Sequence, residues 1–117
     1  MKITSTQDNG ITIIRLSGRF DATVADQFKE SVQQLCEKGL SNFVINMSDV
    51  SYIDSSGLGS IITFLRKIRL AKGDIKVASL SDKVRSIFQL TRFHRVIEIF
   101  DNSESATLSF NTLHGKE

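Results

Sequence analysis

The chain has 117 residues, of which 40% are hydrophobic and 24% are charged, an ordinary composition for a globular protein. This length suits one domain, which buries roughly two-thirds of the surface that its unfolded chain exposes. A formal charge of +2, a single Tyr and no Trp argue against a nucleic-acid binder. The lone Cys36 excludes an internal disulfide, and no metal-ligand spacing surrounds it.

The N-terminal segment also bears on where the protein works. Residues 1–5 lack the apolar run of a signal peptide. Elsewhere, no apolar stretch approaches the roughly 20 residues of a membrane span. The sequence therefore predicts a cytoplasmic protein that does not associate with a membrane.

The first third of the chain predicts a hairpin followed by a helix. Residues 3–7 form a short strand, the turn Asp8-Asn9-Gly10 suits a hairpin, and residues 11–17 form a second strand. A helix is expected over residues 21–38, where Gly39 ends it. Its apolar stripe at helical spacing consists of Val24, Phe28, Val32 and Leu35.

The middle of the chain predicts a central strand and a second helix. The apolar run at residues 43–47 is typical of a strand covered on both faces. The following helix spans about residues 56–71. Its buried stripe is expected to be Leu58, Ile61, Ile62, Leu65 and Ile68. Phe64 lies outside this stripe, so it either packs locally or belongs to a contact surface.

Shorter elements complete the chain: a strand at 75–80, a helix capped by Ser81, a strand at 96–100 and a last helix at about 101–110. Strands and helices that alternate with short connections predict an α/β fold with parallel pairing wherever a helix crosses over. The initial hairpin adds an antiparallel edge. We therefore expect a single α/β domain with a mixed β-sheet of four to five strands and about four helices. Its core is expected at residues 3–110, with a frayed tail at 111–117.

One segment, residues 47–60, is unusual because it joins the end of the central strand to the start of a helix, where function usually sits in such sheets. Ser55 or Ser56 can cap the helix. Gly57 and Gly59 fall in its first turn, and each lowers helix stability by up to about 1 kcal/mol relative to Ala. Two such residues indicate that something approaches the backbone closely; the alternative is a capped helix packed tightly against the sheet.

The same segment resembles a known family. The run Asp54-Ser55-Ser56-Gly57-Leu58-Gly59, preceded by residues 46–53, is similar to the signature of the anti-sigma-factor antagonists, the bacterial STAS domains. Residues 18–22, Gly-Arg-Phe-Asp-Ala, resemble the turn that leads from the family's second strand into its first helix. The order of elements agrees from about Ile3 to Phe110. The resemblance implies that residues 1–117 form a single STAS domain.

The resemblance also implies a function by partner switching. In that family the unphosphorylated protein binds an anti-sigma factor that is also an ATP-dependent serine-protein kinase, and this binding releases a sigma factor. Phosphorylation inactivates the antagonist, and a serine phosphatase of the PP2C type restores it. Carried onto this chain, the acceptor is Ser55. The implied partner-binding residues are Asp21, Asp54, Ser56, Gly57, Leu58 and Gly59. The resemblance implies a monomeric protein that is not an enzyme and needs no metal or cofactor.

Several residues keep a second interpretation. Asp21 suits the N-cap of the first helix, which does not exclude a place at an interface. An enzyme with Ser55 or Asp54 as nucleophile is disfavoured, because no histidine base is near and the sequence is no Gly-x-Ser-x-Gly elbow. The alternative function that the resemblance leaves open is that of an adaptor module in a signalling system without a sigma factor or in a transport complex, as in related STAS domains. Four basic residues lie near the end of the second helix: Arg66, Lys67, Arg69 and Lys72. Cations at this end stabilise the helix dipole, so we interpret these residues as a solvated helix end rather than an anion-binding site.

Overall fold

A computed structural model describes the backbone of residues 1–114 and the side chains as far as Phe110. Five strands form one sheet in the order β1-β2-β3-β4-β5. They are β1 (Lys2–Asp8), β2 (Ile11–Phe20), β3 (Asn42–Ile53), β4 (Asp74–Ala78) and β5 (Glu98–Phe100). The helices are α1 (Ala22–Glu37), α2 (Ser55–Leu70), α3 (Asp82–Leu90), the 3₁₀ turn η1 (Phe93–Arg95) and α4 (Ser103–His114).

The sheet is mixed, as the sequence predicts. β1 pairs with β2 antiparallel through the hairpin turn, in which Asn9 and Gly10 both have positive φ angles of 52° and 82°. These angles match a two-residue hairpin turn whose twist suits the flanking strands. All the other neighbouring strands pair in parallel. The predicted class, a single α/β domain with a five-stranded mixed sheet and four α-helices, is confirmed.

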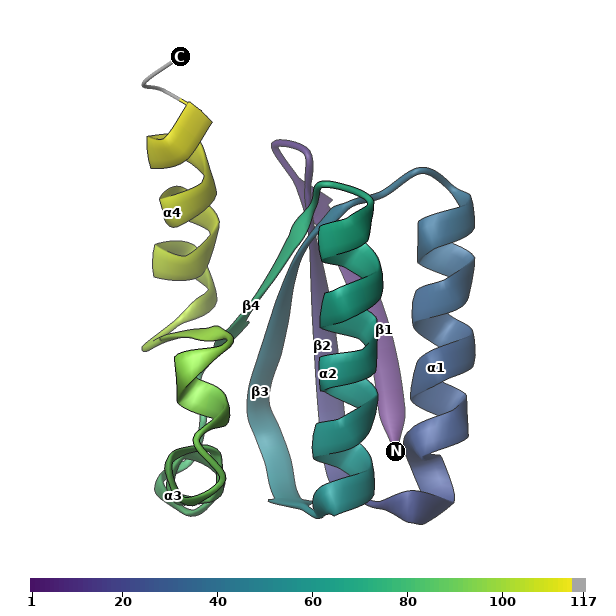
Figure 1. Ribbon diagram of the computed structural model, residues 1–117, viewed down its shortest axis with the longest axis vertical. Helices are drawn as coiled ribbons and strands as arrows, with labels where there is room; N and C mark the ends of the chain where they lie inside the picture. The colour runs from purple at the N-terminus through teal and green to yellow at the C-terminus, as the bar shows by residue number, and fades with distance from the viewer. Residues whose placement is uncertain (115–117) are drawn as a thin grey trace.

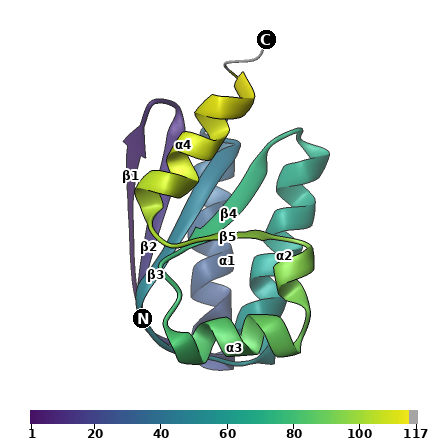
Figure 2. The same ribbon diagram turned by 90° about the vertical axis from the view of Figure 1, so that its left-hand side faces the viewer.

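Helices cover the two faces of the sheet unequally (Figures 1 and 2). α1 and α2 lie side by side on one face, α4 crosses the other, and α3 lies near the edge where the parallel strands end. Alternation along β3 explains both layers, because Phe43 and Ile45 belong to the core under α1 and α2, whereas Val44 packs toward α4. β3 is therefore covered on both faces, which accounts for the nearly continuous apolar run at residues 43–47.

Phe64 belongs to the core. Only 3% of this residue is exposed, and its ring lies 5.9 Å from the Phe28 ring of α1 and 5.0 Å from the Phe43 ring of β3. Both pairs meet edge to face, an arrangement that stabilises aromatic clusters. Phe64 therefore joins α1, α2 and the central strand, and the interpretation as a contact-surface residue is wrong.

The central strand is longer than expected. The sequence predicts a connection over residues 47–53, but β3 continues to Ile53 and stays paired with β2. At each of two register shifts, β3 contains one extra residue relative to β2. At the first shift, for example, Arg15 pairs with Asn46 and Ser17 with Asp49, so β2 advances by two residues while β3 advances by three. The Asn46 side chain accepts a hydrogen bond from the Ser48 amide at 3.0 Å, which satisfies backbone at the first bulge.

The ends of other elements differ by a few residues. α4 starts at Ser103 rather than 101 and continues through His114, beyond the expected end at Phe110. Of the expected tail at 111–117, residues 115–117 lie outside the described residues. Within the described part of the chain, no helix has both the length and the apolar character needed to span a bilayer.

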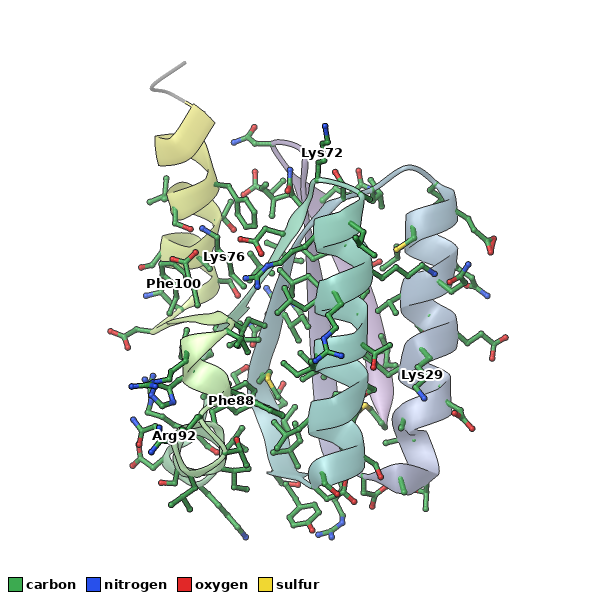
Figure 3. All side chains as sticks on the ribbon, in the orientation of Figure 1. Lys29, Lys72, Lys76, Phe88, Arg92 and Phe100 are labelled. Carbon is green, nitrogen blue, oxygen red and sulfur yellow. The ribbon has the colours of Figure 1, made fainter. Side chains whose placement is uncertain are left out.

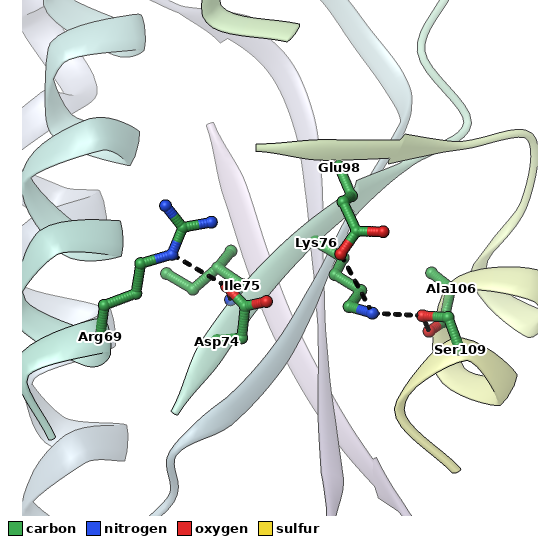
Figure 4. A network of polar contacts seen from close by, with 7 residues as sticks. All are labelled: Arg69, Asp74, Ile75, Lys76, Glu98, Ala106 and Ser109. Carbon is green, nitrogen blue, oxygen red and sulfur yellow. Dashed lines mark hydrogen bonds and ion pairs between the residues drawn. The ribbon is translucent and has the colours of Figure 1, made fainter. Parts of the chain in front are cut away.

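Lys76 is buried beneath α4, with only 1% of its side chain exposed. Its ammonium lies 2.5 Å from the Ser109 hydroxyl and 3.4 Å from a Glu98 carboxylate oxygen (Figure 4). The rings of Phe110 and Phe100 lie 4.4 and 5.4 Å from the same nitrogen. These contacts connect β4 to β5 and α4.

We expect the packing of Lys76 to matter more than its charge. Lys76→Ala removes a buried chain of methylenes and should lower the free energy of unfolding by about 3 kcal/mol. Lys76→Met keeps most of the volume, and removing a buried charge is often neutral or stabilising. Urea denaturation of the two variants measures the difference. A Met variant as unstable as the Ala variant would show that the ammonium contacts hold α4 in place.

Candidate functional site

The candidate site lies at the sheet edge where α1 and α2 begin, at the bottom of Figure 1. β2 ends at Phe20 and β3 at Ile53, and these two residues are partners in the parallel register. The chain leaves each strand through an aspartate, Asp21 or Asp54, that caps the next helix. The Asp54 amide also donates to the Phe20 carbonyl at 3.2 Å. The fold thus places two acidic N-caps next to each other on neighbouring strands.

Ser55 is the first residue of α2 and is exposed to solvent. Asp54, not Ser55 or Ser56, caps the helix, because its Oδ1 accepts a hydrogen bond from the Gly57 amide at 3.0 Å. The prediction of a serine cap is therefore wrong. Both serine hydroxyls are left out of the capping, and Ser56 is exposed as well. The hydroxyl of Ser55 is thus accessible at the positive end of the α2 dipole.

The two glycines of the first turn differ in their surroundings. A β-carbon at Gly57 would lie 2.4 Å from the Phe20 carbonyl oxygen and 2.9 Å from Ile53 Cγ1, both within the protein. A β-carbon at Gly59 would have no atom within 4 Å. Gly57 and its neighbour Leu58 are buried, whereas Gly59 is exposed. Close packing against β2 therefore explains Gly57, and nothing within the described structure requires a glycine at 59.

Asp21 holds its position through a local network. Its Oδ1 accepts hydrogen bonds from the Thr23 amide at 3.1 Å and the Thr23 hydroxyl at 2.5 Å, and Arg19 lies 3.7 Å from Oδ2. The hydroxyl bond, helped by the amide and by the charge of Arg19, lowers the pKa of the Asp21 carboxyl from its ordinary value of 3.8, against the opposing effect of desolvation. Asp21 is therefore charged at neutral pH.

This network gives a prediction for pH dependence. A lowered folded-state pKa means that Asp21 stabilises the fold fully above the unfolded value of 3.8, and that this stabilisation is lost as the pH falls through the folded value. Thr23→Ala removes the main cause and should raise the pKa of Asp21, whereas Thr23→Ser keeps the hydroxyl and the lowered pKa. An NMR titration of the Asp21 carboxyl carbon measures both. Equal pKa values in the two variants would contradict this origin of the shift.

The sequence alone did not indicate a cationic stack beside the aspartates. The Arg19 guanidinium lies 4.2 Å from the centre of the Tyr52 ring, and the Lys83 ammonium lies 6.0 Å from it. Arg19 and Tyr52 are register partners on β2 and β3, one residue before each strand ends. In the sequence, Arg19 precedes Asp21 by two residues and Tyr52 precedes Asp54 by two. This equal spacing indicates a contact between Arg19 and Tyr52 only when the pairing of β2 and β3 is known.

The predicted site residues fall into three groups. Ser55, Ser56 and Gly59 are exposed, Asp21 and Asp54 are half-buried, and Gly57 and Leu58 are buried. The fold brings the N-terminal turns of α1 and α2 to one edge. Such an edge offers an exposed hydroxyl, two oriented carboxylates and a helix N-terminus, which suits contact with another protein and the attachment of a phosphate.

Comparison with known proteins identifies the same family that the sequence resembles. The sequence profile of the STAS domain matches residues 2–106, so the chain belongs to the STAS domain family. Within that family it resembles the antagonists of anti-sigma factors, as the sequence predicts. The anti-sigma-B factor antagonist of Bacillus subtilis is 30% identical over 91 residues, which cover 78% of this chain and 83% of the relative.

Solved structures agree with the fold. A crystal structure from Thermotoga maritima, described as a candidate anti-sigma factor antagonist, superposes with a TM-score of 0.87 at 26% identity and covers 92% of each chain. The anti-sigma factor antagonist SpoIIAA in its unphosphorylated form superposes with a TM-score of 0.72 at 19% identity, over 95% of this chain and 98% of that protein. At 19% identity, the similarity to SpoIIAA shows a shared fold only.

Proposed function

We propose that this protein is an anti-sigma factor antagonist that acts by partner switching. Its unphosphorylated form binds an anti-sigma factor that is also an ATP-dependent serine-protein kinase, and this binding releases a sigma factor. The kinase phosphorylates Ser55, which ends the interaction. A serine phosphatase of the PP2C type restores the binding form.

The observation that carries the proposal is the exposed position of Ser55 at the first turn of α2. A kinase reaches a serine only when the hydroxyl and its flanking backbone are accessible. The names of the relatives support the antagonist role. SpoIIAA, which shares the fold, has been solved in a phosphorylated form with the same TM-score of 0.72, so a STAS fold tolerates a phosphate.

The proposed interface consists of the exposed part of the edge. Asp54 and Ser56 flank the acceptor serine, Gly59 follows one turn later, and Asp21 caps the neighbouring helix. Gly57 and Leu58 are buried beneath this turn. A phosphate adds about −1.5 to −2 charge beside two carboxylates, which repels an acidic or tightly packed partner. The same phosphate is favourable to α2 itself, because it sits at the positive end of the helix dipole. Phosphorylation therefore acts on binding and leaves the fold intact.

The remaining parts of the proposal follow from this role. The protein has no turnover of its own, works in the cytoplasm as a monomer when free, and contacts neither membrane nor nucleic acid. Residues 3–110 form the core of its single STAS domain.

A kinase assay tests the acceptor. With the cognate kinase and ATP, intact-mass spectrometry should detect one added phosphate, and peptide mapping should assign it to Ser55. Ser55→Ala should remove the labelling completely, while Ser56→Ala should retain it because Ser56 only flanks the acceptor. Phosphate on Ser56, or on any residue away from the start of α2, would refute the assignment of Ser55.

A further inference from the structure

A second surface lies on the side of α2 that faces away from α1. A groove of about 360 Å³ runs between α2 and the segment that connects α3 to β5. Four apolar side chains line it: Ile62, Leu65, Phe93 and Val96. Val96 is 45% exposed, and Leu90, directly before the connecting segment, is 84% exposed. Apolar surface that stays open in this way commonly marks a site of interaction.

The rims of this groove are basic. Arg66 and Arg69 line the α2 side, and Arg92 lines the opposite side. Arg69 is occupied by Asp74, whose Oδ1 lies 3.3 Å from its Nε (Figure 4). Among residues 1–110, neither Arg66 nor Arg92 forms an ion pair. Two exposed arginines without a carboxylate partner therefore stand on opposite rims of an apolar floor.

The groove also has a fixed relation to Ser55. On a helix of 3.6 residues per turn, Ser55, Gly59, Ile62 and Arg66 fall on one face. Gly59 has no side chain, and no atom lies within 4 Å of the position that a β-carbon would occupy there, so the helix surface is open between the start of α2 and the groove. Ile62 is roughly 10 Å of helix rise beyond Ser55, so the groove is a separate surface.

We propose that this groove is a docking site for an amphipathic helix of a partner protein, with acidic residues flanking its apolar stripe. The apolar floor suits leucine-type side chains at helical spacing, and the arginines on the two rims suit carboxylates on both sides of that stripe. A concave trough favours inserted side chains over a flat anionic membrane. The proposal goes beyond the phosphorylation of Ser55 and does not depend on it.

The test uses a defined helical probe. A capped peptide of about 18 residues, long enough to form a helix in water, carries leucines at i, i+3, i+4 and i+7 with glutamates beside them. A second peptide has lysines in place of the glutamates. NMR titration of the isotope-labelled full chain should show binding of the acidic peptide, with shifts at Ile62, Leu65, Phe93 and Val96. No binding, or equal binding of the lysine peptide, overturns the proposal.

Matched variants test the position of the probe. Arg66→Glu combined with Arg92→Glu should weaken the acidic peptide at least about tenfold, whereas Lys29→Glu combined with Lys72→Glu, which changes net charge equally, should weaken it less than about twofold. Lys29 on α1 and Lys72 past the end of α2 lie away from Arg92 (Figure 3). Melting temperatures check that all variants fold.

Two further outcomes separate the alternatives. Ser55→Asp adds a charge about 10 Å of helix rise from Ile62, where salt largely screens it, and should change the peptide affinity less than about twofold. A failure of the groove is therefore distinguishable from a failure of the phosphorylation proposal. Loss of peptide binding in Ser55→Asp would place the probe at the start of α2 and overturn the groove. Binding to vesicles of phosphatidylglycerol, without binding to the acidic peptide, would assign the basic rims to a membrane surface instead.

Discussion

Ser55→Asp is expected to lower the affinity of this protein for the anti-sigma factor proposed as its partner about a hundredfold, which corresponds to roughly 3 kcal/mol of binding free energy. The new carboxylate stands directly after the half-buried Asp54, and Asp21 begins the neighbouring helix. A packed interface would have to desolvate this charge next to two others of the same sign. A phosphate, with its greater charge and bulk, should have at least the same effect.

The fold of this variant should be unaffected. A carboxylate in the first turn of α2 interacts favourably with the helix dipole. The melting temperature of Ser55→Asp should therefore stay at or slightly above that of the wild-type chain. Isothermal titration calorimetry with the anti-sigma factor, together with a thermal melt, measures the two effects separately.

Two controls make this result specific. Ser55→Asn adds a similar volume without charge and should weaken binding much less than Ser55→Asp. Ser56→Asp puts the same charge on the adjacent exposed serine. Because Ser56 belongs to the proposed interface, Ser56→Asp should also weaken binding. A Ser55→Asp protein that bound as tightly as wild type while Ser56→Asp bound weakly would contradict the specific role of position 55.

Local signals in the sequence were sufficient for most of the fold. Asn9-Gly10 marked the hairpin, Gly39 the end of α1 with a positive φ of 84°, and Ser81 the start of α3, where its hydroxyl accepts from the Val84 amide at 3.2 Å. In each case, residues within a few positions of one another determine the geometry. Such features can be predicted without knowledge of the tertiary structure.

Features that depend on pairing between distant segments were not predictable. The polar residues Ser48 and Asp49 interrupt the apolar pattern, so the sequence does not indicate that β3 continues past them. Pairing with β2 and the hydrogen bond to the Asn46 side chain keep this part of the chain extended. Three consecutive residues, Asp54-Ser55-Ser56, are all suitable N-caps. The bond from the Asp54 amide to the Phe20 carbonyl, made across two strands, favours the aspartate.

The candidate site shows the same division. The resemblance to the family indicated Ser55, Asp21 and Asp54, and the sequence pattern placed both glycines in the first turn of a helix. It could not distinguish Gly57 from Gly59, because the difference lies in what surrounds each residue. Two positions apart on a helix, they point in very different directions, one toward Phe20 and the other toward solvent.

Gly57→Ala is therefore expected to lower the free energy of unfolding by about 3 kcal/mol, near the upper end for overpacking in a core. The added β-carbon would meet the Phe20 carbonyl oxygen at 2.4 Å, and backbone cannot move aside as a flexible side chain can. The displaced turn would also carry Ser55 and the Asp54 cap with it. Urea denaturation gives the stability, and the kinase assay gives the accessibility of Ser55.

Gly59→Ala is the matched control, since it makes the same chemical change two residues later. With open space around the site, the better helix propensity of Ala should raise the free energy of unfolding by up to about 1 kcal/mol. Because Gly59 is exposed beside Ser55, the same change should weaken the anti-sigma factor complex if the partner contacts bare backbone there. A Gly57→Ala protein as stable as wild type would contradict the packing argument. A Gly59→Ala protein with unchanged affinity would remove Gly59 from the interface and leave its presence in α2 without a functional cause.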